Sequence, residues 1–126
     1  MTQIVANILI TPDGTRLQSY HRHDFKTYLD KNGKEYMIDG GNEYVRRSAH
    51  GDEVVYTVTT DDSFDDIRAN FHWGTRGKDG KQPLTWKPLK SLDTDHIQAI
   101  LETQFHIPQW ARTVFEEELK YRELTA

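Results

Sequence analysis

Hydrophobic and polar residues alternate along the first half of the chain. Residues 4–11 are apolar and rich in β-branched side chains, residues 16–30 alternate between apolar and polar, and residues 54–60 give the clearest strand pattern. Turn sequences separate these stretches, with Pro-Asp-Gly at 12–14 and Asn-Gly at 32–33. The pattern predicts an antiparallel meander of about five or six strands.

The second half has the spacing of helices. Residues 61–71 begin with Asp and Ser cap signals followed by further acids, which is typical of a helix N-terminus. Residues 93–105 and 110–119 each place apolar side chains on one face. We therefore expect one domain, residues 1–126, of the α+β class, in which an antiparallel sheet from the N-terminal half packs against about two or three C-terminal helices.

Composition narrows the class of protein. The chain has 126 residues and no cysteine, so a disulfide scaffold, a thiolate metal site and a cysteine nucleophile are excluded. Residues 1–11 lack the basic segment and cleavage site of a signal peptide. No apolar run approaches the roughly 20 residues of a membrane span, so we expect a cytoplasmic protein without a membrane partner.

The charges are distributed unevenly. The formal net charge is −4, which argues against broad coating of nucleic acid. Residues 76–90 nevertheless hold one Arg and four Lys against a single Asp, whereas residues 61–66 and 116–118 are acidic. A basic segment inside an acidic protein indicates a local anionic ligand.

The basic segment overlaps the stretch "HWGTRGKDGKQPL" at residues 72–84. Its glycines at 74, 77 and 80 permit positive φ, so consecutive N–H groups could point into one concavity. A guanidinium can grip two phosphate oxygens, and an indole can stack on a base. The alternative is a solvated connection with the indole in the core. The candidate ligand-binding residues here are Trp73, Arg76, Lys78 and Lys81, of which Arg76 is expected to contribute most.

Two other clusters offer further candidates. Arg46 and Arg47 alternate on a predicted strand, so one could serve the anion site while the other forms an ion pair, for example with Asp39. His21 and His23 fall on one face of a predicted strand and form an alternative metal site, although they supply only two ligands. No catalytic motif is recognisable, so we assign no catalytic residue and expect no cofactor.

Most of the chain resembles a family of small proteins encoded by tailed bacteriophages and prophages. The likeness is carried by residues 11–48, 71–84, 89–104 and 117–122. It implies a virus-encoded accessory protein made in a bacterial cytoplasm, and no catalytic residues carry over. Small phage proteins of this sort often disarm host defence. Among them are the Thoeris anti-defence proteins, which sequester cyclic nucleotide signals. They are similar in size and in having a strand-rich N-terminal part and a helical C-terminal part.

A shorter likeness concerns the glycine-rich stretch alone. Trp73, Gly74, Gly77 and Gly80, followed by glutamine, resemble the W-G-R-x-G-x-x-G-Q run of WGR domains, which bind DNA ends. The chain departs from that run at Thr75, where the family has Arg, and its glutamine comes one residue late.

These observations favour a phage-encoded, non-enzymatic binding protein with a counter-defence role. Its partner would be a nucleotide-like anion or a host defence protein. The alternatives are a nucleic-acid-binding accessory protein and a small metal-dependent hydrolase. The aromatic content of three Trp, six Tyr and five Phe is large for one small core, which predicts a homo-oligomer.

Overall fold

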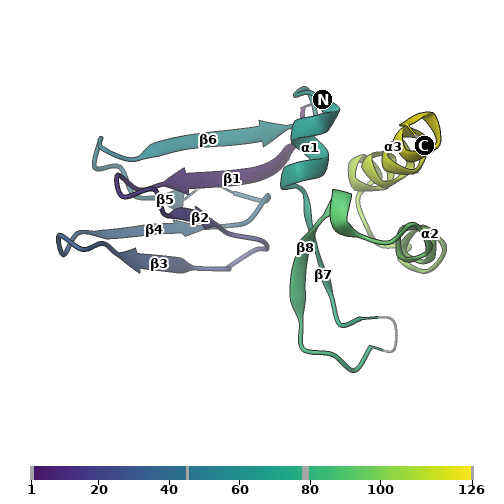
Figure 1. Ribbon diagram of the computed structural model, residues 1–126, viewed down its shortest axis with the longest axis horizontal. Coiled ribbons are helices and arrows are strands. Elements are labelled where there is room, and N and C mark those ends of the chain that lie inside the picture. Colours follow the sequence, from purple (N-terminus) through teal and green to yellow (C-terminus); the bar gives the residue numbers. More distant parts are fainter. Residues whose placement is uncertain (1, 45, 78–79, 126) are drawn as a thin grey trace. The chain divides into compact units, whose positions relative to one another are not determined.

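The computed structural model describes residues 2–44, 46–77 and 80–125. The chain forms two compact units, Met1–Ser63 and Phe64–Ala126. The first unit contains strands β1 to β6, and the second contains the helices and the hairpin β7–β8 (Figure 1). The predicted α+β class is confirmed. The expectations of one domain and of helices packed on the N-terminal sheet stay predictions.

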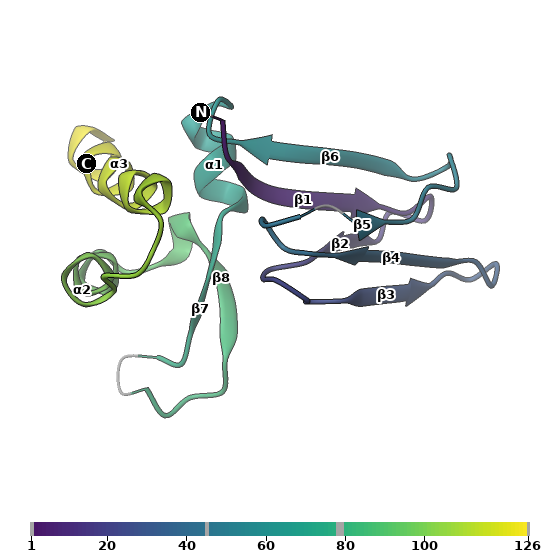
Figure 2. The same cartoon turned by 180° about the vertical axis from the view of Figure 1, so that it is seen from behind.

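The first unit is built from two antiparallel sheets. One sheet has the order β2-β1-β6 and the other the order β3-β4-β5 (Figure 2). A core cluster of Leu9, Leu17, Tyr36 and Ile38 draws on strands of both sheets, and Tyr28 packs against it. The strands are β1 (Ile4–Ile10), β2 (Arg16–Gln18), β3 (Lys26–Leu29), β4 (Glu35–Asp39), β5 (Arg46–Arg47) and β6 (Val54–Thr59).

The prediction of one alternating strand over residues 16–30 is wrong. The chain leaves β2 after Gln18 and enters β3 only at Lys26. Ser19 stabilises the intervening turn, because its hydroxyl donates to Asp24 O at 2.7 Å and accepts the Gly41 N–H at 2.8 Å. A side chain that bonds the backbone locally competes with a strand ladder. The break moves the chain from one sheet to the other, so the N-terminal half forms two sheets rather than one.

The turn after β4 packs closely against the turn between β2 and β3. Gly41 has φ +58°, and a Cβ on it would lie 2.6 Å from the carbonyl carbon of His21. The Gly41 carbonyl accepts a hydrogen bond from the buried Asn7 side chain at 3.0 Å. Only glycine therefore fits where the two backbones approach each other.

The second unit begins with the helix predicted by the acidic run. Asp65 and Asp66 lie in its first turn, where the helix dipole favours acids. Phe71, Trp110 and Phe115 pack as tilted ring pairs with centroids 5.5 and 5.7 Å apart. The elements are α1 (Phe64–Asn70), β7 (His72–Thr75), β8 (Thr85–Pro88), the 3₁₀ helix η1 (Leu89–Ser91), α2 (Thr94–Thr103) and α3 (Gln109–Thr125).

A buried carboxylate ties these elements together. Glu118 on α3 is fully buried and accepts two hydrogen bonds from Arg68 of α1, each 2.8 Å, and one of 2.7 Å from Arg122. Arg122 also donates to the carbonyls of Leu89 and Leu92. Burial alone would raise the pKa of Glu118, but the hydrogen bonds from the two arginines outweigh it and hold this pKa below its ordinary value.

Over the described residues, none of the helices is both long and apolar enough to cross a bilayer.

Candidate functional site

The register of the β7–β8 hairpin decides which side chains share a face. Trp73 lies opposite Lys87, and Gly74 lies opposite Trp86. Directly opposed residues of an antiparallel pair project to the same side, and the next pair projects to the other side. Gly74 does not have the positive φ expected of it; a Cβ there would lie 3.1 Å from the Trp86 ring. This glycine makes room for an indole.

The connection between the two strands differs from the expected cradle of free N–H groups. Gly77 and Gly80 have φ +81° and +70°, as predicted. Their N–H groups are engaged locally, however, with Thr75 Oγ1 at 3.1 Å and Gly77 O at 3.2 Å respectively. The Gln82 N–H donates to Arg76 O at 2.9 Å. These backbone donors close the turn and are already occupied.

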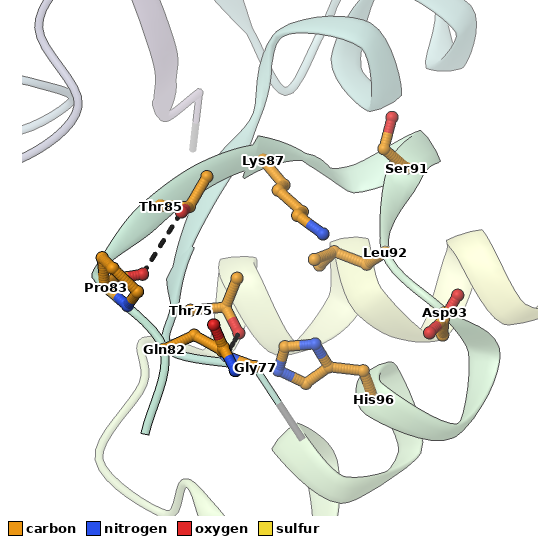
Figure 3. Close-up of a pocket in the computed structure, with 10 residues that line it drawn as sticks. All are labelled: Thr75, Gly77, Gln82, Pro83, Thr85, Lys87, Ser91, Leu92, Asp93 and His96. Carbon is orange, nitrogen blue, oxygen red and sulfur yellow. Dashed lines mark hydrogen bonds between the residues drawn. The ribbon is translucent and has the colours of Figure 1, made fainter. Parts of the chain in front are cut away.

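A polar pocket lies between the hairpin and the start of α2. Its volume is about 350 Å³. The Lys87 amine and the His96 ring both point into it, one from β8 and the other from the first turn of α2 (Figure 3). A cation and an imidazole facing one cavity can bind a phosphate or carboxylate. The lining residues are Thr75, Gly77, Gln82, Pro83, Thr85, Lys87, Ser91, Leu92, Asp93 and His96.

An adjoining pocket is more apolar. It has a volume of about 550 Å³ and shares Gly77 and His96 with the polar pocket. Trp73 forms part of its wall, together with aliphatic side chains of α2. We call the two pockets together the hairpin groove. The second pocket is lined by Trp73, Gly77, Asp95, His96, Ala99, Ile100, Thr103 and Gln104.

Trp73 packs against the core and also lines the groove. Its ring meets Phe115 edge-on, with centroids 5.3 Å apart and planes at 85°. Phe115 is completely buried, so Trp73 belongs to the edge of the core as well as to the wall of the groove. A substitution of Trp73 would therefore change both the packing of the core and the lining of the groove.

The groove also contains acids. Asp93 lines the polar pocket and Asp95 the apolar one. Asp93 is the N-cap residue of α2, but its side chain makes no capping hydrogen bond. Among the described lining residues, Lys87 is the one Lys or Arg, whereas Asp93 and Asp95 are both acids. The groove is therefore not strongly positive, which favours a ligand with few negative charges over a polyphosphate.

The other predicted anion ligands lie elsewhere. Arg76 and Lys81 are exposed and line neither pocket, and Lys78 falls outside the described residues. Sequence reasoning missed Lys87 and His96 as site residues. Lys87 was visible within the basic segment, but its side of the hairpin depends on a register that composition does not reveal.

Arg46 and Arg47 form β5 of the first unit. One of the two arginines was expected to pair with an acid such as Asp39, and it is Arg46 that does so, with its Nη1 4.0 Å from Asp39 Oδ2. Arg46 is 70% exposed, so this pair contributes little to stability. Tyr44 donates to the same oxygen at 3.1 Å. Burial, and then this hydrogen bond, raise the pKa of Tyr44 above its usual value.

The geometric basis of the alternative metal site is wrong. His21 and His23 lie in the turn between β2 and β3, not on one strand face. His21 Nδ1 is 2.8 Å from Arg22 O, while His23, at φ +63°, places Nδ1 3.1 Å from the Tyr44 hydroxyl. Within the described ranges, no three His, Asp or Glu side chains gather in a metal-binding arrangement.

Comparison of the chain with protein-family models, with curated proteins and with solved structures found no match in any of the three. The geometry of the hairpin groove is therefore the main evidence for function.

Proposed function

We propose that this chain is a non-enzymatic binding protein that holds a nucleotide-like anion in the hairpin groove. The supporting observation is that Lys87 and His96 converge on a polar pocket that adjoins a pocket walled by Trp73. A phosphate would interact with the amine and the imidazole, and a flat heterocycle would lie against the indole. The shared lining at Gly77 and His96 lets one ligand occupy both halves.

The biological setting is part of the same proposal and comes from the resemblance to phage proteins. In a bacterial cytoplasm, a protein that binds a nucleotide without converting it lowers the free concentration of that nucleotide. Such sequestration would be a counter-defence activity if the nucleotide were a host signal. Inhibition of a host defence protein is the other form of this role. Mass spectrometry of small molecules released by heating protein purified from bacteria would identify a retained ligand.

Removal of the groove cation should weaken binding. Lys87→Ala is expected to reduce the affinity for nucleoside monophosphates by about tenfold, because a hydrogen bond to a charged group contributes about 1.5 kcal/mol or more. Isothermal titration calorimetry with linear and cyclic mononucleotides measures this change. Lys90→Ala is the matched control, since Lys90 is exposed on η1 and lines neither pocket.

The same titrations separate the groove from the connection beside it. If Arg76→Ala reduced affinity more than Lys87→Ala, the anion would be held by the connection, as the sequence suggested, and the groove assignment would be wrong. If no mononucleotide bound to the wild-type protein, the proposed ligand class would be wrong.

Binding to single-stranded or double-stranded nucleic acid is the second candidate, favoured by the five basic residues at 76–90. Salt dependence distinguishes it from a nucleotide pocket. Contacts with several phosphates release counterions, so affinity falls steeply between about 50 and 200 mM salt, whereas a single phosphate in a pocket gives a shallow slope. Fluorescence anisotropy with labelled oligonucleotides across this range measures the slope.

A further inference from the structure

Strand β6 forms an open edge of its sheet. Among the strands that the structure describes, β6 pairs with β1 on one side and with none on the other, as the order β2-β1-β6 shows (Figures 1 and 2). Its sequence, VVYTVT, contains no charge, proline or glycine. Natural proteins usually protect such an edge with charges, proline or a bulge, because unpaired N–H and C=O groups there can pair with another strand.

Hydrogen bonding shows which backbone groups face that edge. The Thr11 N–H donates to Thr15 O across the turn to β2. Along an antiparallel strand, the backbone N–H and C=O groups of successive residues point alternately to the two sides. The backbone groups of odd-numbered residues at this end of β1 therefore point to β2, and those of Ile8 point to β6. Ile8 is registered with Tyr56, so Tyr56 faces β1. The backbone groups of Val55 and Thr57 therefore point towards the open edge.

The C-terminal end of this edge already has a hydrogen-bond acceptor within the chain. The outward-facing Thr59 N–H donates to Asp62 Oδ2 at 2.7 Å. Pairing with a new strand is thus confined to the central part of β6. Three apolar side chains in this part are unusually exposed to solvent: Val54 is 59% exposed, Tyr56 39% and Val55 36%.

We propose that β6 pairs antiparallel with β6 of a second copy of this chain, about a two-fold axis at Tyr56. In this register Val55 pairs with Thr57 of the second copy and Thr57 with its Val55, so each edge residue exchanges both backbone hydrogen bonds. The two Tyr56 side chains then lie directly opposite each other. Burial of their rings and of Val54 supplies apolar stabilisation.

Charge favours this register. It places Glu53 opposite Thr59 of the second copy. A shift of the pairing that moves the axis to Thr57 would instead place Glu53 opposite Asp61 and would need the Thr59 N–H that Asp62 occupies. Two like charges opposite each other destabilise a strand pair. The contact is short, so the dimer should be weak and depend on concentration.

Charged substitutions at the axis test the proposal. Tyr56→Lys and Tyr56→Glu should each give a monomer, with dimerisation at least about tenfold weaker, because each places two like charges face to face. An equimolar mixture of the two variants should form a dimer again, because lysine then faces glutamate. Sedimentation velocity over micromolar concentrations measures all three samples. The control is Phe105→Lys, which changes a side chain that is 76% exposed outside β6 and should leave the dimer unchanged.

Val55→Pro provides a second test that does not depend on the tyrosine. It removes an outward N–H but keeps the backbone pairing of Tyr56 with Ile8 of β1, so the fold should survive while the dimer is lost. Circular dichroism confirms folding. A wild-type protein that stays monomeric, or variants that remain dimeric although folded, would overturn the proposal. A dimer in each single variant with no gain on mixing would place the interface elsewhere.

Discussion

Replacement of Glu118 by glutamine is expected to lower the free energy of unfolding of the second unit by about 3 kcal/mol. Loss of one partner of a buried ion pair costs about 3–5 kcal/mol, and the lower end applies here because Arg68 and Arg122 remain 19% and 22% exposed. Arg68 and Arg122 would lose their charged acceptor, and the links from α3 to α1 would weaken. Urea denaturation monitored by tryptophan fluorescence measures the loss.

Glu117→Gln is the matched control, because Glu117 is the preceding residue on the same helix and is exposed. Its effect should stay within about 0.5 kcal/mol. Equal effects of the two substitutions would show that the buried network does not stabilise the unit.

The same carboxylate makes stability depend on pH. The folded-state pKa of Glu118 lies below its ordinary value of 4.5, so the unfolded state binds the proton more readily. The stabilisation is therefore complete above the ordinary value and is lost as the pH falls through the lower folded-state pKa. Between neutral pH and pH values below the ordinary pKa, the stability difference between wild type and Glu118→Gln should shrink. A constant difference would contradict the assigned ion pairs.

Gly41→Ala should destabilise the first unit by about 2–5 kcal/mol. The left-handed backbone at φ +58° costs a residue with a Cβ about 1–2 kcal/mol. Overlap with the His21 backbone adds about 1–3 kcal/mol, because the atoms in contact are main-chain atoms that cannot rotate away. Thermal unfolding followed by circular dichroism measures the change.

Gly33→Ala separates these two contributions. Gly33 also has a positive φ, +82°, but no atom lies within 4 Å of a Cβ built there. It should therefore show only the backbone cost of about 1–2 kcal/mol. If both variants lost the same stability, the close approach of Gly41 to His21 would have no energetic consequence.

Local signals predicted much of the fold. The alternation at 54–60 and the apolar stripes after residue 93 correspond to β6, α2 and α3, because each pattern matches the period of its element over several residues. The acidic run before α1 was recognisable from its cap and dipole signals. Strand alternation failed at residues 19–25, where Ser19 bonds Asp24 and Gly41 and local hydrogen bonding replaces the ladder.

The candidate site was only partly visible in the sequence. Trp73 was identified from its position beside a glycine-rich basic stretch, and it does line the groove. Lys87 and His96 were not assigned, since their convergence depends on the hairpin register and on where α2 begins. Arg76 was favoured for its chemistry, yet its side chain lies outside both pockets. The types of residue in the basic segment suggested a class of ligand. Which of these residues line the groove depends on the tertiary structure.

The pairing of Trp73 with Lys87 has a consequence for how this protein can change during evolution. A slip of one residue in the hairpin would turn every β8 side chain to the opposite face, exchanging Lys87 for Trp86 beside the groove. The strands could still pair, but the Lys87 amine would leave the proposed binding groove. Substitution of an exposed residue such as Arg76 should therefore be tolerated more readily than a single insertion or deletion in this connection. Selection would act on the length of the connection as well as on the residues in it that line the groove.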